Sequence, residues 1–221
     1  MTWQLHSTEQ RLELTHPEHN PFYLDFSEGK LAHRFQQGIG KSEPLAKAIG
    51  VKKNNIPTVL DVTAGMGRDA FVIACCGCQV TLLERSSVLV SLLQDAMQRA
   101  RQDENLTPII ERMQLIEADS IQYLNQLTEK PDVIYLDPMY PDRKKSALVK
   151  KEMRIIRELV GNDQDVESLF NAALEKAEKR VVVKRPKLAG FIGDKEPTHQ
   201  ITGKTTRFDV YLIPSPREGC C

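Results

Sequence analysis

The stretch from residue 58 to residue 70 constrains the fold most, because an apolar run breaks there into a glycine-spaced loop and then resumes with helical spacing. Residues 58–62 are short and apolar, as buried strands are, and Gly65 and Gly67 punctuate the loop that follows. Glycine lets a backbone turn tightly and approach a ligand closely. The pattern predicts a strand, a ligand-binding loop and a helix, in that order.

Further apolar runs place this unit in a larger α/β sheet. Strands that alternate with helices form parallel sheets, and the two last runs, joined by a short turn, are expected to add an antiparallel pair. We therefore expect a Rossmann-like α/β domain over residues 51–214 and a disordered tail over 215–221. The expected strands are 58–62, 80–84, 113–117, 132–136, 180–184, 198–201 and 208–213, and the clearest helices are 87–101 and 165–178.

Residues 1–50 are expected to form an extension that precedes this domain. Residues 12–35 alternate as strands do, which predicts a β-hairpin with its turn at 27–30, and a short helix is expected at 44–49. Between them, Gly40, Lys41 and Ser42 match the end of a phosphate-binding P-loop. The first glycine of that motif falls on Phe35, which would obstruct the wrap around a phosphate. We expect instead a flexible loop that closes over substrate, with Lys41 available to a phosphate.

Composition limits the class of protein. A chain of 221 residues with 41% apolar content can bury one sizeable core. No apolar run approaches the roughly 18 residues that a membrane helix needs, and no export signal is recognisable at the start, so we expect a cytoplasmic protein without a membrane span. Cys75 and Cys78 form one C-x-x-C, but no second pair or histidine follows at ligand spacing. We expect core side chains there and no metal.

Acidic residues stand at the ends of three successive predicted strands. Asp61 ends the first, Glu84 the second and Asp119 follows the third. In an open α/β sheet such positions line one crevice, where a carboxylate can bind ribose hydroxyls or an adenine amine. The loop lacks the third glycine of a dinucleotide fingerprint, since Ala70 occupies that offset. S-adenosylmethionine therefore fits this crevice better than NAD.

A second loop, residues 137–141, follows another strand and has the sequence Asp-Pro-Met-Tyr-Pro. The Asp137 carboxylate and the Pro138 carbonyl can both accept from one amino group, and Tyr140 offers a ring on which a base can stack. A nucleobase amine is a poor nucleophile because its lone pair is conjugated into the ring. Two acceptors that hold its hydrogens would direct the lone pair toward a methyl group. We expect Asp137, Pro138 and Tyr140 to be catalytic.

These loops resemble those of known methyltransferases. Residues 137–140 resemble the (D/N/S)-P-P-(Y/F) motif of amino-methyltransferases that act on adenine, cytosine or guanine, and 61–67 resemble their S-adenosylmethionine motif. Longer strings resemble a narrower family, the ribosomal RNA small subunit methyltransferase J group, which methylates the exocyclic N2 of a guanine in 16S rRNA. The resemblance runs from about residue 12 to residue 213. The strings that carry it are 61–71, 83–85, 135–141, 145–154 and 180–186.

The resemblance implies which residues contact or frame the methyl donor. Two departures accompany it: Met139 replaces the second proline of the general motif, as is usual in this group, and the N-terminus is shorter than the usual start of the family, which bears on substrate docking. The donor-binding residues expected from the crevice and from the resemblance are Asp61, Gly65, Gly67, Arg68, Asp69, Glu84, Arg85, Asp119, Ser120 and Asp137.

Basic residues follow both loops of the predicted active site. Residues 142–187 contain 13 Lys and Arg against 8 Asp and Glu, although the net charge of the whole chain is zero. Cations in that position can hold RNA phosphates while an unpaired or flipped guanine enters the pocket. We expect a monomer whose partner is 16S rRNA or the small ribosomal subunit; the alternatives are an amino-methyltransferase for DNA adenine or cytosine and a P-loop nucleotide-binding module. The expected RNA-binding residues are Lys41, Arg143, Lys144, Lys145, Lys150, Lys151, Lys184 and Arg185.

Overall fold

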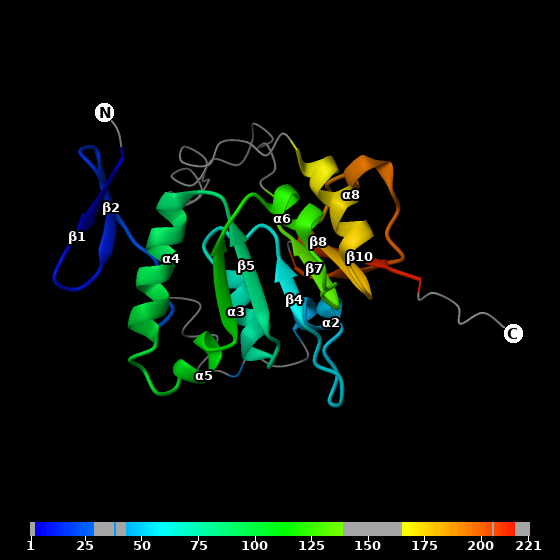
Figure 1. The fold of residues 1–221 in the computed structure, drawn as a ribbon, viewed down its shortest axis with the longest axis horizontal. Helices are drawn as coiled ribbons and strands as arrows, with labels where there is room; N and C mark the ends of the chain where they lie inside the picture. The colour runs from blue at the N-terminus through cyan, green and yellow to red at the C-terminus, as the bar shows by residue number, and fades with distance from the viewer. Residues whose placement is uncertain (1–2, 29–37, 39–42, 139–164, 205, 215–221) are drawn as a thin grey trace, which may run out of the picture.

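The computed structural model describes residues 3–28, 38, 43–138, 165–204 and 206–214. Within these residues a seven-stranded sheet runs through the molecule in the order β6-β5-β4-β7-β8-β10-β9 (Figure 1). The strands from β6 to β8 are parallel, whereas β10 is antiparallel to both of its neighbours. The strands are β4 (Val59–Asp61), β5 (Val80–Glu84), β6 (Met113–Glu117), β7 (Val133–Leu136), β8 (Arg180–Pro186), β9 (His199–Thr202) and β10 (Thr206–Leu212).

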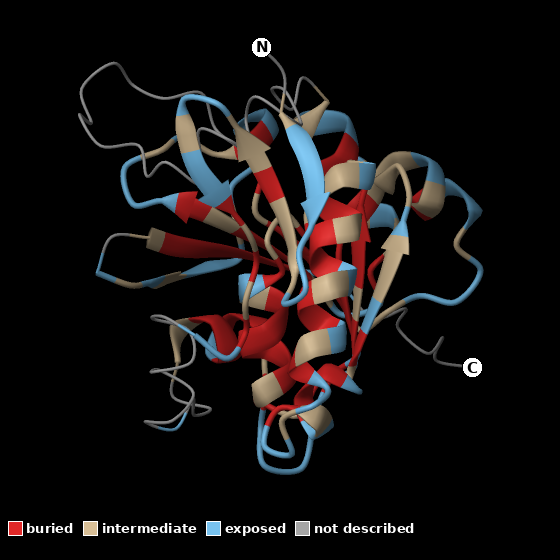
Figure 2. Cartoon of the chain, turned by 90° about the vertical axis from the view of Figure 1, so that its left-hand side faces the viewer, coloured by how far each residue is buried: buried red, intermediate tan, exposed pale blue. Residues whose placement is uncertain are grey.

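Helices cover both faces of this sheet, because successive strand side chains point to opposite sides. Leu82 belongs to the apolar cluster on one face and Leu83 to the cluster on the other. The first cluster includes residues of α2 (Pro44–Ile49), α3 (Arg68–Cys75), α4 (Ser87–Ala100) and α5 (Thr107–Ile110), and the second includes residues of α6 (Ser120–Gln126), α8 (Val166–Lys176) and η1 (Ile192–Asp194). Figure 2 shows the buried residues along the central strands and the inward sides of the helices. The expected Rossmann-like sheet with its antiparallel C-terminal pair is confirmed, and each strand lies within two residues of its predicted bounds.

Inside the described ranges, no helix is both long and apolar enough to cross a membrane. The short helix α2 has its predicted bounds and packs against α3 and against β8, β9 and β10. Its apolar residues therefore join the core of the main sheet, although they precede the expected domain boundary at residue 50.

The N-terminal extension forms a small antiparallel sheet of its own, with β1 (Gln4–Ser7), β2 (Leu12–His16) and β3 (His19–Phe22) in that order. The predicted position of the hairpin is wrong: the chain turns between β2 and β3, and residues 23–28 form no strand. Phe22, Leu24 and Phe26 alternate because they pack as an extended segment on the main core, where Phe26 stacks on Phe71. The predicted return arm, residues 31–35, lies outside the described residues, as does the tail 215–221.

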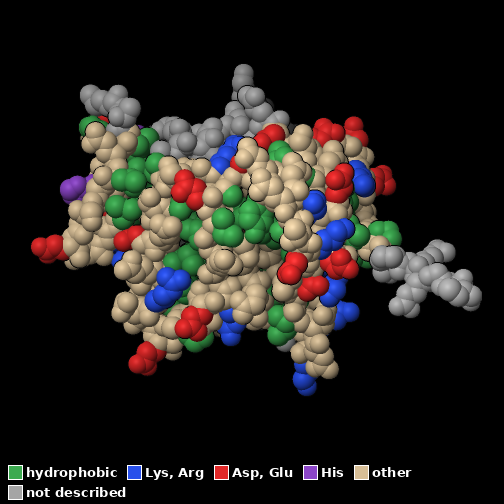
Figure 3. Space-filling model, in the orientation of Figure 1, with side chains coloured by type: hydrophobic (Ala, Val, Ile, Leu, Met, Phe, Trp, Pro, Cys, Tyr) green, Lys and Arg blue, Asp and Glu red, His purple; other side chains and the backbone are tan. Residues whose placement is uncertain are grey.

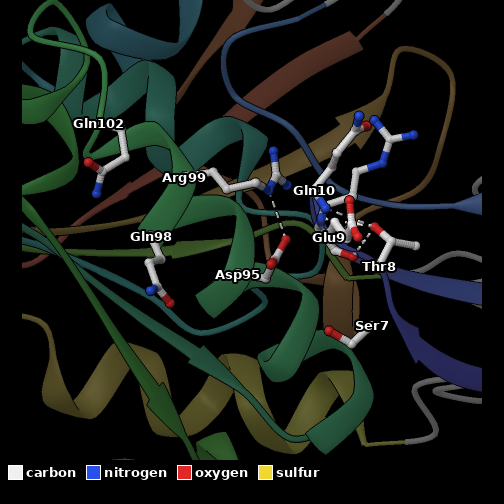
Figure 4. A pocket seen from close by; sticks show the side chains of 9 residues that line it. Ser7, Thr8, Glu9, Gln10, Asp95, Gln98, Arg99 and Gln102 are labelled. Atoms are coloured by element: carbon white, nitrogen blue, oxygen red, sulfur yellow. Dashed lines mark hydrogen bonds and ion pairs between the residues drawn. The ribbon is translucent and has the colours of Figure 1, made fainter.

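One arginine joins this extension to α4. The guanidinium of Arg99 donates to the Asp25 carboxylate, to the Leu24 carbonyl and, at 2.9 Å, to Asp95 one turn earlier in its own helix. Beside it, a hollow of about 280 Å³ lies where the turn between β1 and β2 faces α4 (Figure 4). Residues of the C-terminal half of α4 line this hollow, and the loops that follow β4 and β7 contribute none of its lining.

We predict that Arg99→Ala loosens the N-terminal sheet. The side chain is 25% exposed and its loss leaves the Asp25 carboxylate and the Leu24 carbonyl without this donor. The free energy of unfolding, measured by urea denaturation, should fall by about 1–3 kcal/mol, with faster hydrogen exchange in β2. Arg101→Ala, an exposed neighbour, should change it by less than about 0.5 kcal/mol. Equal effects of the two substitutions would show that Arg99 does not fasten the extension.

Candidate active site

The strand order brings two loops together at one edge of the sheet. The chain runs outward from β4 to β5 and β6, then returns to β7 on the other side of β4, so the order reverses between β4 and β7. Ligands bind at such a reversal, beyond the carboxyl ends of the strands. Here the Asp137 backbone N–H donates to Thr63 Oγ1 at 2.6 Å, which joins the loop after β7 directly to the loop after β4.

Asp61 is buried at the end of β4. Its side chain is 1% exposed, and one oxygen accepts from the Thr63 backbone N–H at 3.0 Å and from its hydroxyl at 3.4 Å. Burial, together with the charges of Asp69 and Asp137, raises the pKa of Asp61 to about 8, against the opposing effect of the Thr63 N–H. Asp61 therefore gives up its proton less readily than an exposed aspartate does, and its hydrogen bonds to Thr63 brace the loop that leaves β4.

Lys184 lies between two further carboxylates of the site. Its Nζ is 2.6 Å from Asp69 Oδ2 and 2.8 Å from Asp137 Oδ2, and Asp69 Oδ2 also accepts from the buried Tyr135 hydroxyl at 2.6 Å. Burial lowers the pKa of Lys184, but the two carboxylates outweigh it and the net change is upward. Burial raises the pKa of Asp137, Lys184 opposes this and Asp69 adds to it, with a net upward change. The Asp137 side chain is still 38% exposed, so a substrate can reach it.

Glu84 fastens the glycine loop from the next strand. Its two oxygens accept from the Gly65 N–H at 3.0 Å and from the Ser86 N–H at 2.8 Å, and the residue is 7% exposed. Burial raises the pKa of Glu84, and these N–H groups oppose it. Asp119 accepts from the Gln122 N–H at 2.9 Å and so caps α6, while the Ser120 hydroxyl donates to the Val62 carbonyl at 2.7 Å. Both acids are at the expected edge of the sheet, with backbone partners that the sequence did not reveal.

The remaining expected donor residues lie at the same edge. Arg68 begins α3, and Arg85 forms an ion pair at 3.7 Å with Asp165, both half exposed. Among the expected RNA-binding residues, the structure places two differently from the prediction. Lys184 points into the carboxylate cluster, and Arg185 is 7% exposed with its guanidinium donating to the Gly190 carbonyl. Adjacent strand residues face opposite sides of a sheet, so Lys184 and Arg185 cannot both flank one crevice.

The other expected site residues lie outside the described part of the chain. They are Tyr140, Lys41, Arg143, Lys144, Lys145, Lys150 and Lys151. Among the residues that are described, no group of three or more His, Cys, Asp or Glu side chains is arranged to hold a metal ion. Of the C-x-x-C pair, Cys78 is a buried core thiol, and Cys75 is partly buried and packs against the same apolar cluster.

Two site residues were missed from the sequence, Thr63 and Tyr135. Thr63 joins the two loops, and Tyr135 supports Asp69 from inside the sheet. A tyrosine within an apolar strand was a usable signal, because a buried hydroxyl nearly always finds a hydrogen-bond partner. Thr63 gave a weaker signal, since a threonine beside a glycine loop is common in any turn.

We predict different effects of adding a methyl group at the two loop glycines. Both have positive φ, 53° at Gly65 and 68° at Gly67. A Cβ at Gly67 would lie 2.8 Å from Leu93 Cδ2, whereas at Gly65 the nearest atom is the Thr63 carbonyl oxygen at 3.8 Å. Gly67→Ala should therefore lower the unfolding free energy by at least about 2 kcal/mol, from backbone strain plus overpacking.

Gly65→Ala should cost only the backbone strain, about 1–2 kcal/mol, yet weaken S-adenosylmethionine binding measured by calorimetry, because its new methyl group projects where a ligand would approach the loop. Equal stability loss in both variants, or unchanged donor affinity in Gly65→Ala, would contradict this reading of the loop.

Comparisons with known proteins find similar sequences over nearly the whole chain. A family model described as "Putative SAM-dependent methyltransferase" matches residues 1–213. A relative from Aeromonas salmonicida, named Ribosomal RNA small subunit methyltransferase J, is 50% identical over 216 residues, 96% of this chain and 87% of the relative. A relative of the same name from Nitrosococcus oceani is 52% identical over 206 residues, 92% of this chain and 81% of the relative.

A solved structure is also similar. The crystal structure of a SAM-dependent methyltransferase from Neisseria gonorrhoeae superposes with a TM-score of 0.77 at 36% identity, over 95% of this chain and 82% of that one. The family model and relatives of this identity cover nearly the whole chain, glycine loop and Asp137 loop included. The chain therefore belongs to the family of SAM-dependent methyltransferases that contains the ribosomal RNA small subunit methyltransferase J proteins.

Proposed function

We propose that this enzyme transfers a methyl group from S-adenosylmethionine to the exocyclic N2 of a guanine in 16S rRNA. The observation that carries the proposal is the position of Asp137, which extends from β7 beside the glycine loop of β4, with its backbone held by Thr63 and its carboxylate partly exposed. The names of the relatives support ribosomal RNA as the substrate. Together they favour this function over DNA methylation and over a P-loop nucleotide-binding module.

The donor crevice fits a nucleoside that carries a positive charge. Gly65 has no Cβ and leaves open space beside its backbone, so a ligand can come close to the loop. Glu84 stands at the carboxyl end of β5, where each carboxylate oxygen keeps its N–H partner and has a second lone pair that can accept from a ribose hydroxyl. The carboxylates of Asp69 and Asp137 complement a sulfonium. When bound, S-adenosylmethionine supplies a methyl group on a good leaving group; the residues of the chain align the acceptor with it.

In this proposal the loop after β7 binds the acceptor amine. The Asp137 carboxylate and the Pro138 carbonyl would each accept a hydrogen bond from one of the two N2 hydrogens. These two bonds would localise the lone pair on the nitrogen. Positive charge develops on that nitrogen as the methyl group moves, and an ionised carboxylate stabilises it more strongly in the transition state than in the ground state. We propose that Tyr140 stacks on the guanine ring. A base held in this way must be unpaired or flipped out of its helix.

We propose that individual lysines and arginines beside the active site bind the RNA. On the face drawn in Figure 3, acidic and basic side chains of the described residues are interspersed. We propose that Lys41, Arg143, Lys144, Lys145, Lys150 and Lys151 contact phosphates beside the Asp137 loop.

We also propose that the protein is cytoplasmic, because rRNA is modified where ribosomes are made, and that it is a monomer.

Asp137 and Glu84 are assigned different roles, so their substitutions should have different effects on turnover and on donor binding. Asp137→Asn keeps the shape of the side chain but removes its charge, so kcat should fall about 100-fold or more, while donor affinity should fall less than it does in Glu84→Gln. Glu84→Gln should mainly weaken donor binding, because the ribose loses a charged acceptor. Methyl transfer to an rRNA fragment gives kcat, and calorimetry gives donor affinity. A loss of donor binding in Asp137→Asn as large as that in Glu84→Gln would contradict the assigned roles.

The substrate is tested by mapping methylated nucleosides in rRNA. In 16S rRNA from cells that lack the protein, mass spectrometry should find one N2-methylguanosine missing. The purified enzyme should restore it at the same position, and Asp137→Asn should not. An unchanged modification map, or restoration of a methyl group on a different base, would exclude the proposed substrate.

A further inference from the structure

The ammonium of Lys184 lies inside a cluster of acids that the proposed reaction needs in a defined state of charge. Asp61 from β4, Asp69 from α3 and Asp137 after β7 converge on this point. The Lys184 side chain is 24% exposed and reaches two of the three carboxylates. The neighbouring strand places Phe208 opposite Lys184 in the register. Lys184 therefore supplies positive charge to acids that would otherwise repel one another.

We propose that Lys184 is a positioning residue for methyl transfer. Its ammonium keeps the Asp137 carboxylate ionised and donates to the Oδ2 atom of that carboxylate, so the other carboxylate oxygen is left to accept from the target amine. The inference rests on the proposed function, since it assumes that Asp137 accepts from an exocyclic amine.

The hydrogen bonds that hold Asp137 and Lys184 in place support this role. Asp137 is held from two sides, by Thr63 Oγ1 at its backbone N–H and by Lys184 at Oδ2. Lys184 is itself held by Asp69, which the hydroxyl of Tyr135 fixes from within the sheet. Tyr135 is 0% exposed, so the chain of contacts ends in the rigid core rather than in solvent. A side chain restrained in this way defines where the acceptor oxygen of Asp137 points.

The charges around Asp137 support the same role, because Lys184 favours the ionised form of its carboxyl group. Close carboxylates disfavour each other's ionised form, and a nearby cation restores it. Burial and Asp69 both raise the pKa of Asp137, whereas Lys184 lowers it. A protonated Asp137 would lose the charge that stabilises the developing positive nitrogen. With both carboxylates ionised, the group of Asp69, Lys184 and Asp137 keeps one net negative charge, which suits a cationic donor.

The same contacts argue against a phosphate role for Lys184. Its ammonium already has two carboxylate partners at 2.6 and 2.8 Å. A phosphate that approached Lys184 would meet the negative charges of both acids. The position in β8 thus suits internal control of the site and not the backbone of an RNA.

The test compares Lys184→Met, Lys184→Arg and a control, Lys179→Met. Lys179 pairs with Asp132 at 2.7 Å at the opposite end of β8, and its side chain is 50% exposed. The rate of a single turnover with saturating donor and rRNA fragment is measured between about pH 5 and pH 9, the range in which a perturbed carboxyl group titrates. Calorimetry gives donor affinity and urea denaturation gives stability for each variant.

We expect Lys184→Met to reduce the rate at least about tenfold near neutral pH and to move the acidic limb of the profile upward by about one pH unit or more, with partial recovery at alkaline pH. Lys184→Arg should keep the limb near its wild-type position. Donor affinity should not weaken in Lys184→Met, because the lost charge has the same sign as the donor. The control should match the wild-type profile.

A second variant, Asp69→Asn, should move the acidic limb of the pH–rate profile in the opposite direction to Lys184→Met. Asp69→Asn removes a negative neighbour of Asp137 but keeps Lys184, so its acidic limb should shift to lower pH; this test does not require Lys184→Met to fold. An unmoved limb in Lys184→Met with a uniform loss of rate, or a raised KM for RNA with unchanged turnover, would overturn the positioning role. A wild-type enzyme that forms no N2-methylguanosine would instead overturn the proposed function.

Discussion

The parallel pairing of β4 with β7 is the constraint on which the site depends. It places the ends of two strands that are more than seventy residues apart in the chain side by side, where Asp137 N–H meets Thr63 Oγ1 across a sequence separation of 74 residues. Each loop alone is a short turn with a polar residue. Joined at the point where the strand order reverses, they form the two sides of one crevice, with the donor expected on the β4 side and the acceptor on the β7 side.

This arrangement concentrates acids, and the protein offsets their repulsion in three different ways. Burial raises the pKa of Asp61 to about 8, which favours its uncharged form. The folded state consequently binds this proton more tightly than the unfolded chain does, so the contribution of Asp61 to stability falls as the pH rises from 3.8, its ordinary pKa, and is lost above about 8. Glu84 accepts from backbone N–H groups, and Asp69 and Asp137 share Lys184. The same carboxylates that repel one another in the free enzyme suit a donor and a transition state that are positively charged.

The N-terminal extension is held to the main domain by polar and by apolar contacts. Arg99 ties residues 24–25 to α4, and Phe26 stacks on Phe71 at the start of the core beneath the glycine loop. The Cβ position of Gly67 faces Leu93 and Phe26, so the donor loop rests on both α4 and the extension. A change in the extension therefore has a direct packing route to the donor loop.

Local sequence determined the strands, the helices and the loops that hold the chemistry. Period-two and helical spacing are properties of neighbouring residues, so they predicted β4 to β8 closely, and Asp61, Glu84 and Asp137 were identified because the ends of parallel strands share one edge. The tertiary structure alone decided the partners. The sequence showed Lys184 and Arg185 as adjacent cations, yet the pleat sends one into the acids and the other to the Gly190 carbonyl. The contacts of Lys184 span 47 and 115 residues. Such partners depend on which face of a strand meets which loop, and that is fixed only when the whole sheet has packed.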